Sequence, residues 1–440
     1  MQNSDNRTTC CVVGGGPAGM MTGYLLARAG VDVTVLEKHG DFFRDFRGDT
    51  VHPSTLEVFH ELGLLEDLLK LPHQRVSVAG GFLGDFGFTA ADFRHLPVRC
   101  PFVALMPQWD FLNFLASRAR RFPSFQLEME HEVSDLILDN GRVAGVAVKT
   151  PAGTKDIWAD LVIGCDGRHS TVRRSAGFEV LDTGVPIDVL WFRISRKSGD
   201  AEQLLGRLNY GKALILINRG EYFQGGLIIR KGTFEQIKGV GLASFRESIA
   251  RIAPFLQDRV EELQDWDQVK LLTVQINHLP RWYRPGLLCI GDAAHAMSPA
   301  GGVGINYAIQ DAIAAARILG RPLRKGQSTA DLLSRVQRRR ELPVRLMQIL
   351  QKQAHVGFAR IFDNPGSLTP PWQFKVVIRI PGLQRLMGRV VGMGILPEHV
   401  RRSPQRRKAI GVACGVGAAL AVLLYRCSAR SRNTKLASLA

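Results

Sequence analysis

The chain has 440 residues, enough for two or three domains, and a formal net charge of +17. Residues 401–440 hold nine Lys or Arg and no acid, which leaves +8 for the rest. No nucleic-acid-binding motif is present, so this charge predicts no nucleic-acid partner. The seven scattered cysteines form no C-x-x-C pair, which argues against a dithiol reductase and a Cys-rich zinc site, and no metal ligand set is predicted. This pattern and the polar first nine residues predict a reducing, cytoplasmic location.

A glycine-rich turn near the N-terminus is the most informative motif. Gly14, Gly16 and Gly19 form G-x-G-x-x-G directly after an apolar strand, Cys10 to Val13. The first glycine permits a tight turn, the second lets a pyrophosphate approach the backbone, and the third lets the following helix pack on the strand. The unpaired N–H groups at the start of that helix favour a phosphate.

A second predicted strand, Val31 to Leu36, ends at an acidic residue. The carboxylate of Glu37, followed by Lys38, is placed to accept hydrogen bonds from a ribose. Strand, turn, helix, strand and acid therefore occur in the order of a dinucleotide-binding βαβ unit.

The next segments alternate between helix and strand patterns. Apolar spacing predicts helices over 53–69 and 109–121, and weak alternation over 76–100 predicts strands away from the dinucleotide sheet. Asn140-Gly141 predicts a hairpin turn between strands at 126–138 and 142–150.

A second unit is predicted as an insertion into the first. Residues 160–164 form a fully apolar strand of the kind that is buried in a parallel sheet. Between residues 185 and 278 the apolar period changes to two. The predicted strands of this unit are 189–195, 213–218, 223–230 and 269–278, interrupted by a helix over 242–252. The chain then returns to a buried strand at 287–290 and a helix over 305–319.

Two further motifs lie at the ends of predicted strands. In residues 164–173, Asp166 and Arg173 belong to a turn whose polar groups face the crevice where cofactors bind. In residues 291–306, Asp292 ends a strand and can accept hydrogen bonds from a polyol. The glycines that follow let the backbone approach a flat ring, and the next helix directs its positive end toward that ring.

With these three motifs in order, the chain resembles the single-component flavoprotein monooxygenases, the group that contains para-hydroxybenzoate hydroxylase. The resemblance covers about residues 8 to 400 and implies FAD as cofactor and NAD(P)H as a transient co-substrate. It departs from the family where many members carry Arg in place of Gln108. The cofactor-binding residues that the resemblance implies are Gly14, Gly16, Gly19, Glu37, Lys38, Arg47, Gln108, Asp166, Arg173, Asp292, Pro299, Gly301, Gly302, Gly304, Ile305 and Asn306.

The resemblance also implies a reaction. NAD(P)H reduces the flavin, O₂ forms a C4a-hydroperoxide, and one oxygen atom is transferred to an aromatic or apolar small molecule by hydroxylation or epoxidation. Two alternatives stay open: a flavin-dependent reductase of isoprenoid double bonds, and a membrane-tethered FAD redox module without its own turnover. A Ser–His hydrolase is disfavoured because Ser170 with His169, and His295 with Ser298, lie inside the flavin motifs.

The residues that contact the substrate are not fixed by the sequence. Trp191, Arg193, Phe223, Gln224 and Asn277 lie on predicted strands of the inserted sheet, where a structural role is favoured. His52 is a pocket candidate, although an exposed loop position is favoured for it. No catalytic acid or base is predicted. Arg335, Arg338, Arg339, Arg340 and Arg345 are predicted to form a solvent-exposed helix face.

The predicted fold is α/β: a Rossmann-type FAD-binding domain with an inserted, mainly antiparallel substrate sheet and C-terminal helices. The FAD-binding domain comprises 8–75, 100–180 and 281–345, the sheet comprises 76–99 and 181–280, and 346–401 is a helical segment.

The predicted tail over 402–440 contains an uncharged run, 409–425, between basic flanks. At 17 residues this run spans roughly 26 Å, slightly short of a ~30 Å hydrocarbon core. We predict peripheral or tail-anchored membrane association through it; the alternative that stays open is a helix packed on the domain or a disordered extension.

Overall fold

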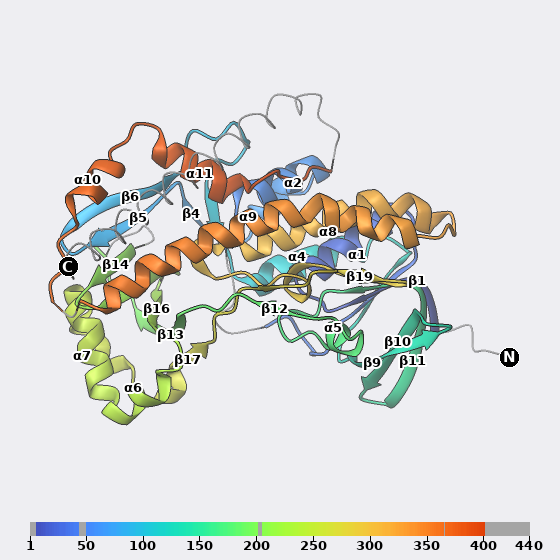
Figure 1. The fold of residues 1–440 in the computed structure, drawn as a ribbon, viewed down its shortest axis with the longest axis horizontal. Coiled ribbons are helices and arrows are strands. Elements are labelled where there is room, and N and C mark those ends of the chain that lie inside the picture. The colour runs from blue at the N-terminus through green and yellow to red at the C-terminus, as the bar shows by residue number, and fades with distance from the viewer. Residues whose placement is uncertain (1–5, 44–49, 201–204, 365, 401–440) are drawn as a thin grey trace, which may run out of the picture.

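The computed structural model describes residues 6–43, 50–200, 205–364 and 366–400. Figure 1 shows two sheet regions side by side along the long axis of the molecule, with long helices running over both. The glycine-rich βαβ unit belongs to one region and the inserted strands to the other.

The first region is built on a parallel sheet, as predicted. Its strands lie in the order β8 (Phe125–Glu128), β2 (Val33–Leu36), β1 (Arg7–Val13), β11 (Gly153–Gly164) and β20 (Leu287–Cys289), with β19 (Tyr283–Arg284) antiparallel at the edge. Residues Cys10 to Val13 are at most 4% exposed. Both faces of the sheet are covered, which explains the continuous apolar run.

The predicted hairpin at Asn140-Gly141 is confirmed. Asn140 and Gly141 both have positive φ, 48° and 79°, as a two-residue hairpin turn requires. The turn joins β9 (Glu132–Asp139) to β10 (Arg142–Thr150). Strand β11 begins earlier than predicted because its first half pairs antiparallel with β10 before its second half enters the parallel sheet.

Three helices, α1 (Pro17–Arg28), α4 (Gln108–Ala119) and α8 (Gly304–Arg324), pack together over this sheet (Figure 1). The prediction of one helix over 53–69 is wrong. Gly63 takes a left-handed conformation, with φ 74°, and separates α2 (Pro53–Leu62) from α3 (Leu65–Leu68).

The inserted region is a seven-stranded sheet. Its order is β17 (Lys270–Leu272), β13 (Ile187–Ser195), β16 (Tyr222–Arg230), β15 (Lys212–Asn218), β14 (Leu205–Asn209), β5 (Val78–Leu83) and β6 (Phe86–Asp92). All neighbours are antiparallel except β14 and β5. Strand β14 was not predicted, and the predicted strand over 269–278 is split into β17 and β18 (Asn277–His278).

The two faces of this sheet carry different contacts. Phe192 and Phe223 pack with Phe245 in a core under α6 (Phe234–Val240) and α7 (Leu242–Ile252). On the opposite face, Trp191 and Ile228 belong to a second cluster. Strand alternation therefore separates a helix-covered face from a face directed toward the rest of the molecule.

The remaining elements are short. They are β3 (Thr50–Val51), β4 (Gln74–Val76), β7 (Val103–Leu105), β12 (Leu181–Asp182), α5 (Thr171–Ser175), α10 (Trp372–Val377), α11 (Leu383–Met393), and 3-10 helices at Pro254–Leu256, Val260–Glu262, Trp266–Gln268, Gly291–Ala293 and Ala300–Gly302.

A long helix, α9 (Ala330–Phe362), corrects one prediction. It also spans residues 345 and 346, between which a domain boundary is predicted, and the domain bounds stay a prediction. The predicted solvent-exposed arginine face is wrong for Arg340, which is 0% exposed, whereas Arg335, Arg338 and Arg345 are exposed. Arg340 is buried because its guanidinium points inward and bonds to the carboxylate of Asp311 on α8.

None of the helices in the described ranges is both long enough and apolar enough to cross a membrane. The 409–425 run, on which that prediction rests, lies outside these ranges.

Candidate flavin site

The three sequence motifs meet in space. The Cys165 N–H donates to the Val13 carbonyl (2.7 Å), and the Ile290 N–H donates to the Gly164 carbonyl (3.0 Å). A Cβ added to Gly14 would lie 2.6 Å from the Cys165 carbonyl oxygen, so these two turns touch. The three motifs, which the sequence places at the ends of separate strands, therefore lie next to one another in the fold.

The glycine-rich turn has the shape of an anion cradle. Gly14 has φ 102°, and a Cβ on Gly19 would lie 1.9 Å from the Gly14 carbonyl oxygen, so both positions require glycine. A Cβ on Gly16 would meet nothing within 4 Å, and helix α1 begins there without a side-chain cap or an acid in its first turn. This open, positive helix end fits a pyrophosphate.

The acid at the end of β2 is buried beside this turn. Glu37 is 8% exposed, and its carboxylate accepts hydrogen bonds from the backbone N–H groups of Gly15 (2.9 Å) and His39 (3.1 Å). These bonds tie the turn to β2, and ribose binding by Glu37 stays a prediction. Lys38 is exposed, and Arg47 lies outside the described residues. Gln108 is the first residue of α4 and is half-buried.

In the second motif the polar groups mainly hold their own turn. Asp166 accepts hydrogen bonds from the Ser170 hydroxyl (2.5 Å) and the Val172 N–H (3.1 Å), and burial raises its pKa. The guanidinium of Arg173 donates to the Arg168 carbonyl, while its Nη1 is buried without a partner. Arg173 therefore keeps one donor available.

The third motif presents Asp292 to this crevice. Its carboxylate is about one-third exposed and lies 3.8 Å from the guanidinium of Arg168. This contact joins the second and third motifs at their polar ends and leaves Asp292 able to accept hydrogen bonds from a polyol.

The predicted ring-binding turn, Pro299 to Asn306, packs against the segment around His52. Gly301 and Gly302 have φ of 79° and 63°, and Gly304 and Ile305 open α8, which has no side-chain cap. Asn306 is 2% exposed; its Oδ1 accepts hydrogen bonds from the His52 N–H (2.9 Å) and the Thr55 hydroxyl (2.7 Å). The Asn306 side chain therefore fastens α8 to α2.

His52 is buried, so the favoured prediction of an exposed loop histidine is wrong. It is 1% exposed, and burial lowers its pKa to about 4, so the ring is neutral at physiological pH. Its Nδ1 lies 2.9 Å from the Val391 carbonyl oxygen, which assigns the proton to Nδ1. The ring also interacts with the backbone of Gly301 and Gly302, which places His52 against the predicted ring-binding turn.

A buried charge cluster lies behind the third motif. Asp311 accepts hydrogen bonds from the Gly291 N–H (3.1 Å), from His295 Nε2 (2.5 Å) and from Arg340 Nε (2.9 Å). The side chains of Asp311, His295 and Arg340 are at most 1% exposed. Burial alone would raise the pKa of Asp311, but the nearby His295 and Arg340 outweigh it and hold the pKa below its ordinary value. Asp311 thereby fixes the turn that carries Asp292.

Helix α9 clamps the turn before Pro299. Gln351 donates to the carbonyls of Ser298 and Ala300 (both 2.9 Å) and accepts from the Ser298 N–H (3.1 Å). His355 Nε2 lies 2.8 Å from the Ser298 hydroxyl, and Gln348 donates to the carbonyls of Asn277 (2.9 Å) and Ala296 (3.0 Å). Helix α9 therefore satisfies the Ser298 N–H and the carbonyls of Ala296, Ser298 and Ala300.

Four of the five predicted candidates lie on the inserted sheet; the placement of Asn277 there is wrong, because it lies on β18, which pairs with β12 in a separate two-stranded sheet. Phe223 is 0% exposed and points under α7, which fits the structural role favoured for it. Gln224 accepts from Arg219 (3.0 Å), Asn277 accepts from the Ala296 N–H (3.3 Å), and Arg193 stacks over Tyr222. Trp191 alone of these keeps a buried polar atom, Nε1, without a partner.

Comparison with known proteins places the chain in a family. A model described as an FAD binding domain matches residues 7–349. A 6-methylpretetramide 4-monooxygenase from Streptomyces rimosus is 32% identical over 397 residues, which cover 87% of this chain and 92% of that protein. The chain belongs to the FAD-dependent monooxygenases.

Other relatives of this monooxygenase are longer. A rifampicin monooxygenase from Streptomyces venezuelae is 29% identical over 68% of the chain, and a dialkyldecalin synthase from Streptomyces rugosporus is 27% identical over 69%. The chain spans 61% and 63% of their lengths. The solved structure of OxyS anhydrotetracycline hydroxylase from S. rimosus has a TM-score of 0.71 at 20% identity, covering 91% of this chain and 78% of that one. This likeness shows a shared fold.

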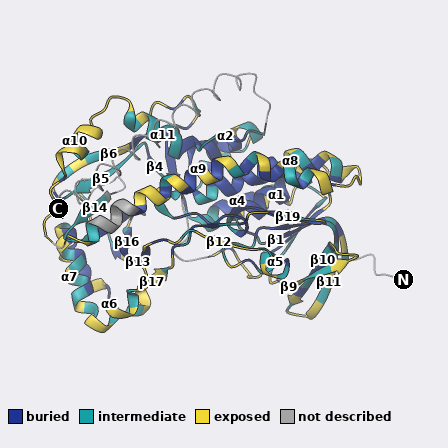
Figure 2. Ribbon diagram, in the orientation of Figure 1, coloured by how far each residue is buried: buried dark blue, intermediate teal, exposed yellow. Residues whose placement is uncertain are grey.

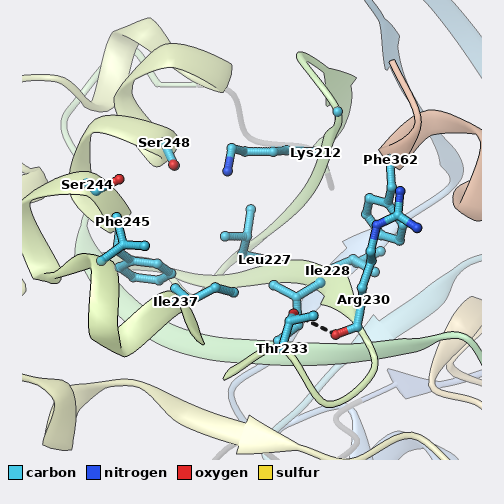
Figure 3. A pocket seen from close by; sticks show the side chains of 13 residues that line it. Lys212, Leu227, Ile228, Arg230, Thr233, Ile237, Ser244, Phe245, Ser248 and Phe362 are labelled. Carbon is cyan, nitrogen blue, oxygen red and sulfur yellow. Dashed lines mark hydrogen bonds between the residues drawn. The ribbon is translucent and has the colours of Figure 1, made fainter. Parts of the chain in front are cut away.

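Figure 3 shows a pocket elsewhere on the monooxygenase, between α6, α7 and the ends of β15 and β16. Lys212 points toward Ser248 across it, and Leu227 and Phe245 form part of its wall. Burial, and then Arg251, lowers the pKa of Lys212. No residue of the three flavin motifs lines this pocket, so it is distinct from the flavin site.

Sequence reasoning missed the residues that support the flavin turns, notably Asp311 and the polar side chains of α9. The sequence does contain a signal for the polar side chains of α9: polar residues recur on one face of a helix whose other polar residues are mainly basic. Their spacing of three or four, or multiples of it, places them on one inward stripe. These residues are Gln337, Arg340, Gln348, Gln351 and His355.

Replacing Asp311 by Asn should destabilise the folded protein by about 3–5 kcal/mol at pH 7, because Arg340 is then buried without a counter-charge. A carboxyl with a lowered pKa stabilises the fold above its unfolded pKa and loses that contribution as the pH falls through the folded value. The difference from the parent should therefore shrink below about pH 4. Urea unfolding at pH 7 and below about pH 4 measures this difference in the free energy of unfolding, with the exposed Asp139→Asn as control. An equal loss of stability at the two pH values would contradict a charged Asp311 that is paired with Arg340.

Proposed function

We propose that this monooxygenase uses NAD(P)H and O₂ to hydroxylate a polycyclic aromatic molecule of polyketide type. The observation that carries the proposal is the apolar sheet face next to the flavin turns. Ile217 of this face packs in one cluster with Leu105 and Val391. Leu105 lies three residues before Gln108, and the Val391 carbonyl contacts His52. The face therefore adjoins the elements that would hold the flavin ring.

The dimensions of this face suit a flat, extended substrate. Trp191, Ile228 and Ile215 come from the adjacent strands β13, β16 and β15 and share the second cluster. Strands lie about 4.8 Å apart, so the three span about 10 Å, comparable to several fused rings. A Cβ at Gly226 would lie 2.8 Å from the Trp191 ring, so glycine leaves room for the indole to lie across the sheet. The free Nε1–H then suits an oxygen substituent on the substrate.

The relatives' names agree with this substrate class. They specify 6-methylpretetramide and anhydrotetracycline. Bound FAD supplies the oxygen-activating chemistry. The chain supplies a positive helix end at α8, a neutral His52, and apolar walls that exclude water.

NAD(P)H is proposed to dock transiently at the second motif. The sequence has one complete G-x-G-x-x-G, so it predicts no separate Rossmann domain that would bind NAD(P)H. The unpartnered Nη1 of Arg173 and the nearby Arg168 supply positive charge for its phosphates.

The purified protein should be yellow, and NAD(P)H oxidation should rise with polycyclic phenols, consuming one O₂ for each NAD(P)H. Oxygen electrode traces, a peroxide assay and product mass measurement test this. Turnover without O₂ would favour the reductase of isoprenoid double bonds. No turnover without a partner would favour a redox module, and product formation without any NAD(P)H would favour a non-oxidative reaction like that named for the dialkyldecalin synthase.

Trp191→Phe should raise KM for the accepted phenol about fivefold with little change in kcat, since one hydrogen bond of about 1 kcal/mol is lost while the aromatic wall remains. Trp266→Phe, which lies in the cluster on the helix-covered face, is the matched control. Equal KM values in both variants would remove Trp191 from the substrate site.

Membrane association through residues 409–425 is a further part of the proposal. The full-length variant Leu420→Asp with Leu423→Asp should lower the share of protein in the membrane fraction, because charged residues are costly in hydrocarbon. Leu436→Asp with Leu439→Asp, outside the apolar run, should not. Identical fractionation of both variants would refute the anchor.

A further inference from the structure

Helix α10 and the turn after it expose an unusual group of apolar side chains. Trp372 is 70% exposed, Val376 56%, Val377 44% and Ile380 45%. Of twelve exposed large hydrophobic side chains in the described chain, these four fall within nine residues. Figure 2 shows α10 as an exposed segment at one end of the molecule. Single exposed apolar residues are ordinary, but a contiguous group marks an interaction surface. We call these four residues the α10 patch.

The α10 patch is held outward by contacts on the opposite side of the helix. The ring of Phe374 packs edge-on against Phe88, with centroids 5.3 Å apart, and against Phe86 at 6.4 Å. Lys375 lies over the Phe86 ring at 5.7 Å. The inner face of α10 is therefore already packed on β6, and the outward face is left for another partner.

The chain segment that carries the α10 patch has charge of one sign. Residues 366–397 contain Lys375, Arg379, Arg385 and Arg389 and no acid. Arg379 and Arg385 are exposed, and neither forms an ion pair with a described residue. The acid that ends this stretch, Glu398, is engaged by Arg317 (3.3 Å) and Arg339 (2.7 Å).

We propose that the α10 patch docks on an anionic phospholipid surface, with Trp372 and its neighbours inserted among the headgroups. Exposed apolar residues with Lys375 and Arg379 beside them in the chain match both layers of such an interface. A second copy of the chain fits less well, because a two-fold contact would bring Arg379 and Arg385 against the same charges. This surface is independent of residues 409–425 and of the substrate.

The location gives the docking a use. Next along the chain from α10, helix α11 packs on β6 of the inserted sheet, and the Val391 carbonyl of α11 contacts His52. The proposed lipid contact thus lies at the edge of the region that covers the flavin site. An apolar substrate dissolved in the bilayer would reach the protein on this side.

Full-length, flavin-loaded protein should sediment with vesicles of phosphatidylcholine and phosphatidylglycerol and less with phosphatidylcholine alone. Trp372→Ser with Val376→Ser should lower the partition coefficient about tenfold. Leu138→Ser with Ile349→Ser removes two equally exposed apolar side chains, at 55% and 54%, outside the α10 patch and should change nothing. The same pairs in the Leu420→Asp, Leu423→Asp background separate this contact from the tail.

Insertion has its own readout. Lipids brominated in the upper acyl chain should quench tryptophan fluorescence in the parent, and Trp372→Phe should keep the partitioning but lose that quenching. Unchanged partitioning of the serine variant, or binding that ignores lipid charge, would overturn the proposal. So would a serine variant that only converts a dimer to a monomer in size-exclusion chromatography, since the occupant would then be a second copy.

Discussion

One buried carboxylate organises the flavin side of the molecule. Asp311 is fully buried on α8, yet it accepts hydrogen bonds from the Gly291 backbone, His295 and Arg340 at the same time. It joins the turn of the third glycine motif to the long helices α8 and α9. A buried charge is tolerated only when its partners are in place, so the cluster selects one arrangement of these elements over others.

The sequence was sufficient where local rules decide the structure. The positive φ of Gly14, the two-residue turn at Asn140-Gly141 and the alternation of β13 and β16 follow from steric and periodic patterns. Residues whose roles depend on distant partners were missed. The sequence around His52 predicts a loop residue, because the residues that contact and bury it, Val391 and Asn306, lie hundreds of positions away. The sequence around Arg340 predicts one more exposed cation in a basic run, because its hydrogen bond to Asp311 of α8 is visible only in the fold.

The inserted sheet serves two neighbours through strand alternation. Phe192 and Phe223 anchor it to α6 and α7, while Trp191 and Ile228 lie on the opposite face, in a cluster with Ile276 and Phe362. A change of register by one residue would exchange these sets, which explains why Gly225 and Gly226 match the aromatic rings of β13 so closely. The periodicity of a strand could be predicted, but which side is inward required the packing of its neighbours.

Helix α9 reaches across both regions. After Pro343 it runs uninterrupted to Phe362, roughly 28 Å, contacting the Ser298 turn through Gln351 and the inserted sheet through Phe362. A hydrogen-bonded rod of this kind transmits a tilt along its whole length. If a ligand bound to the inserted sheet displaced it, α9 would move Gln351 and the Ser298 turn. Ligand binding at the sheet would then be coupled to the position of the cofactor at the flavin site.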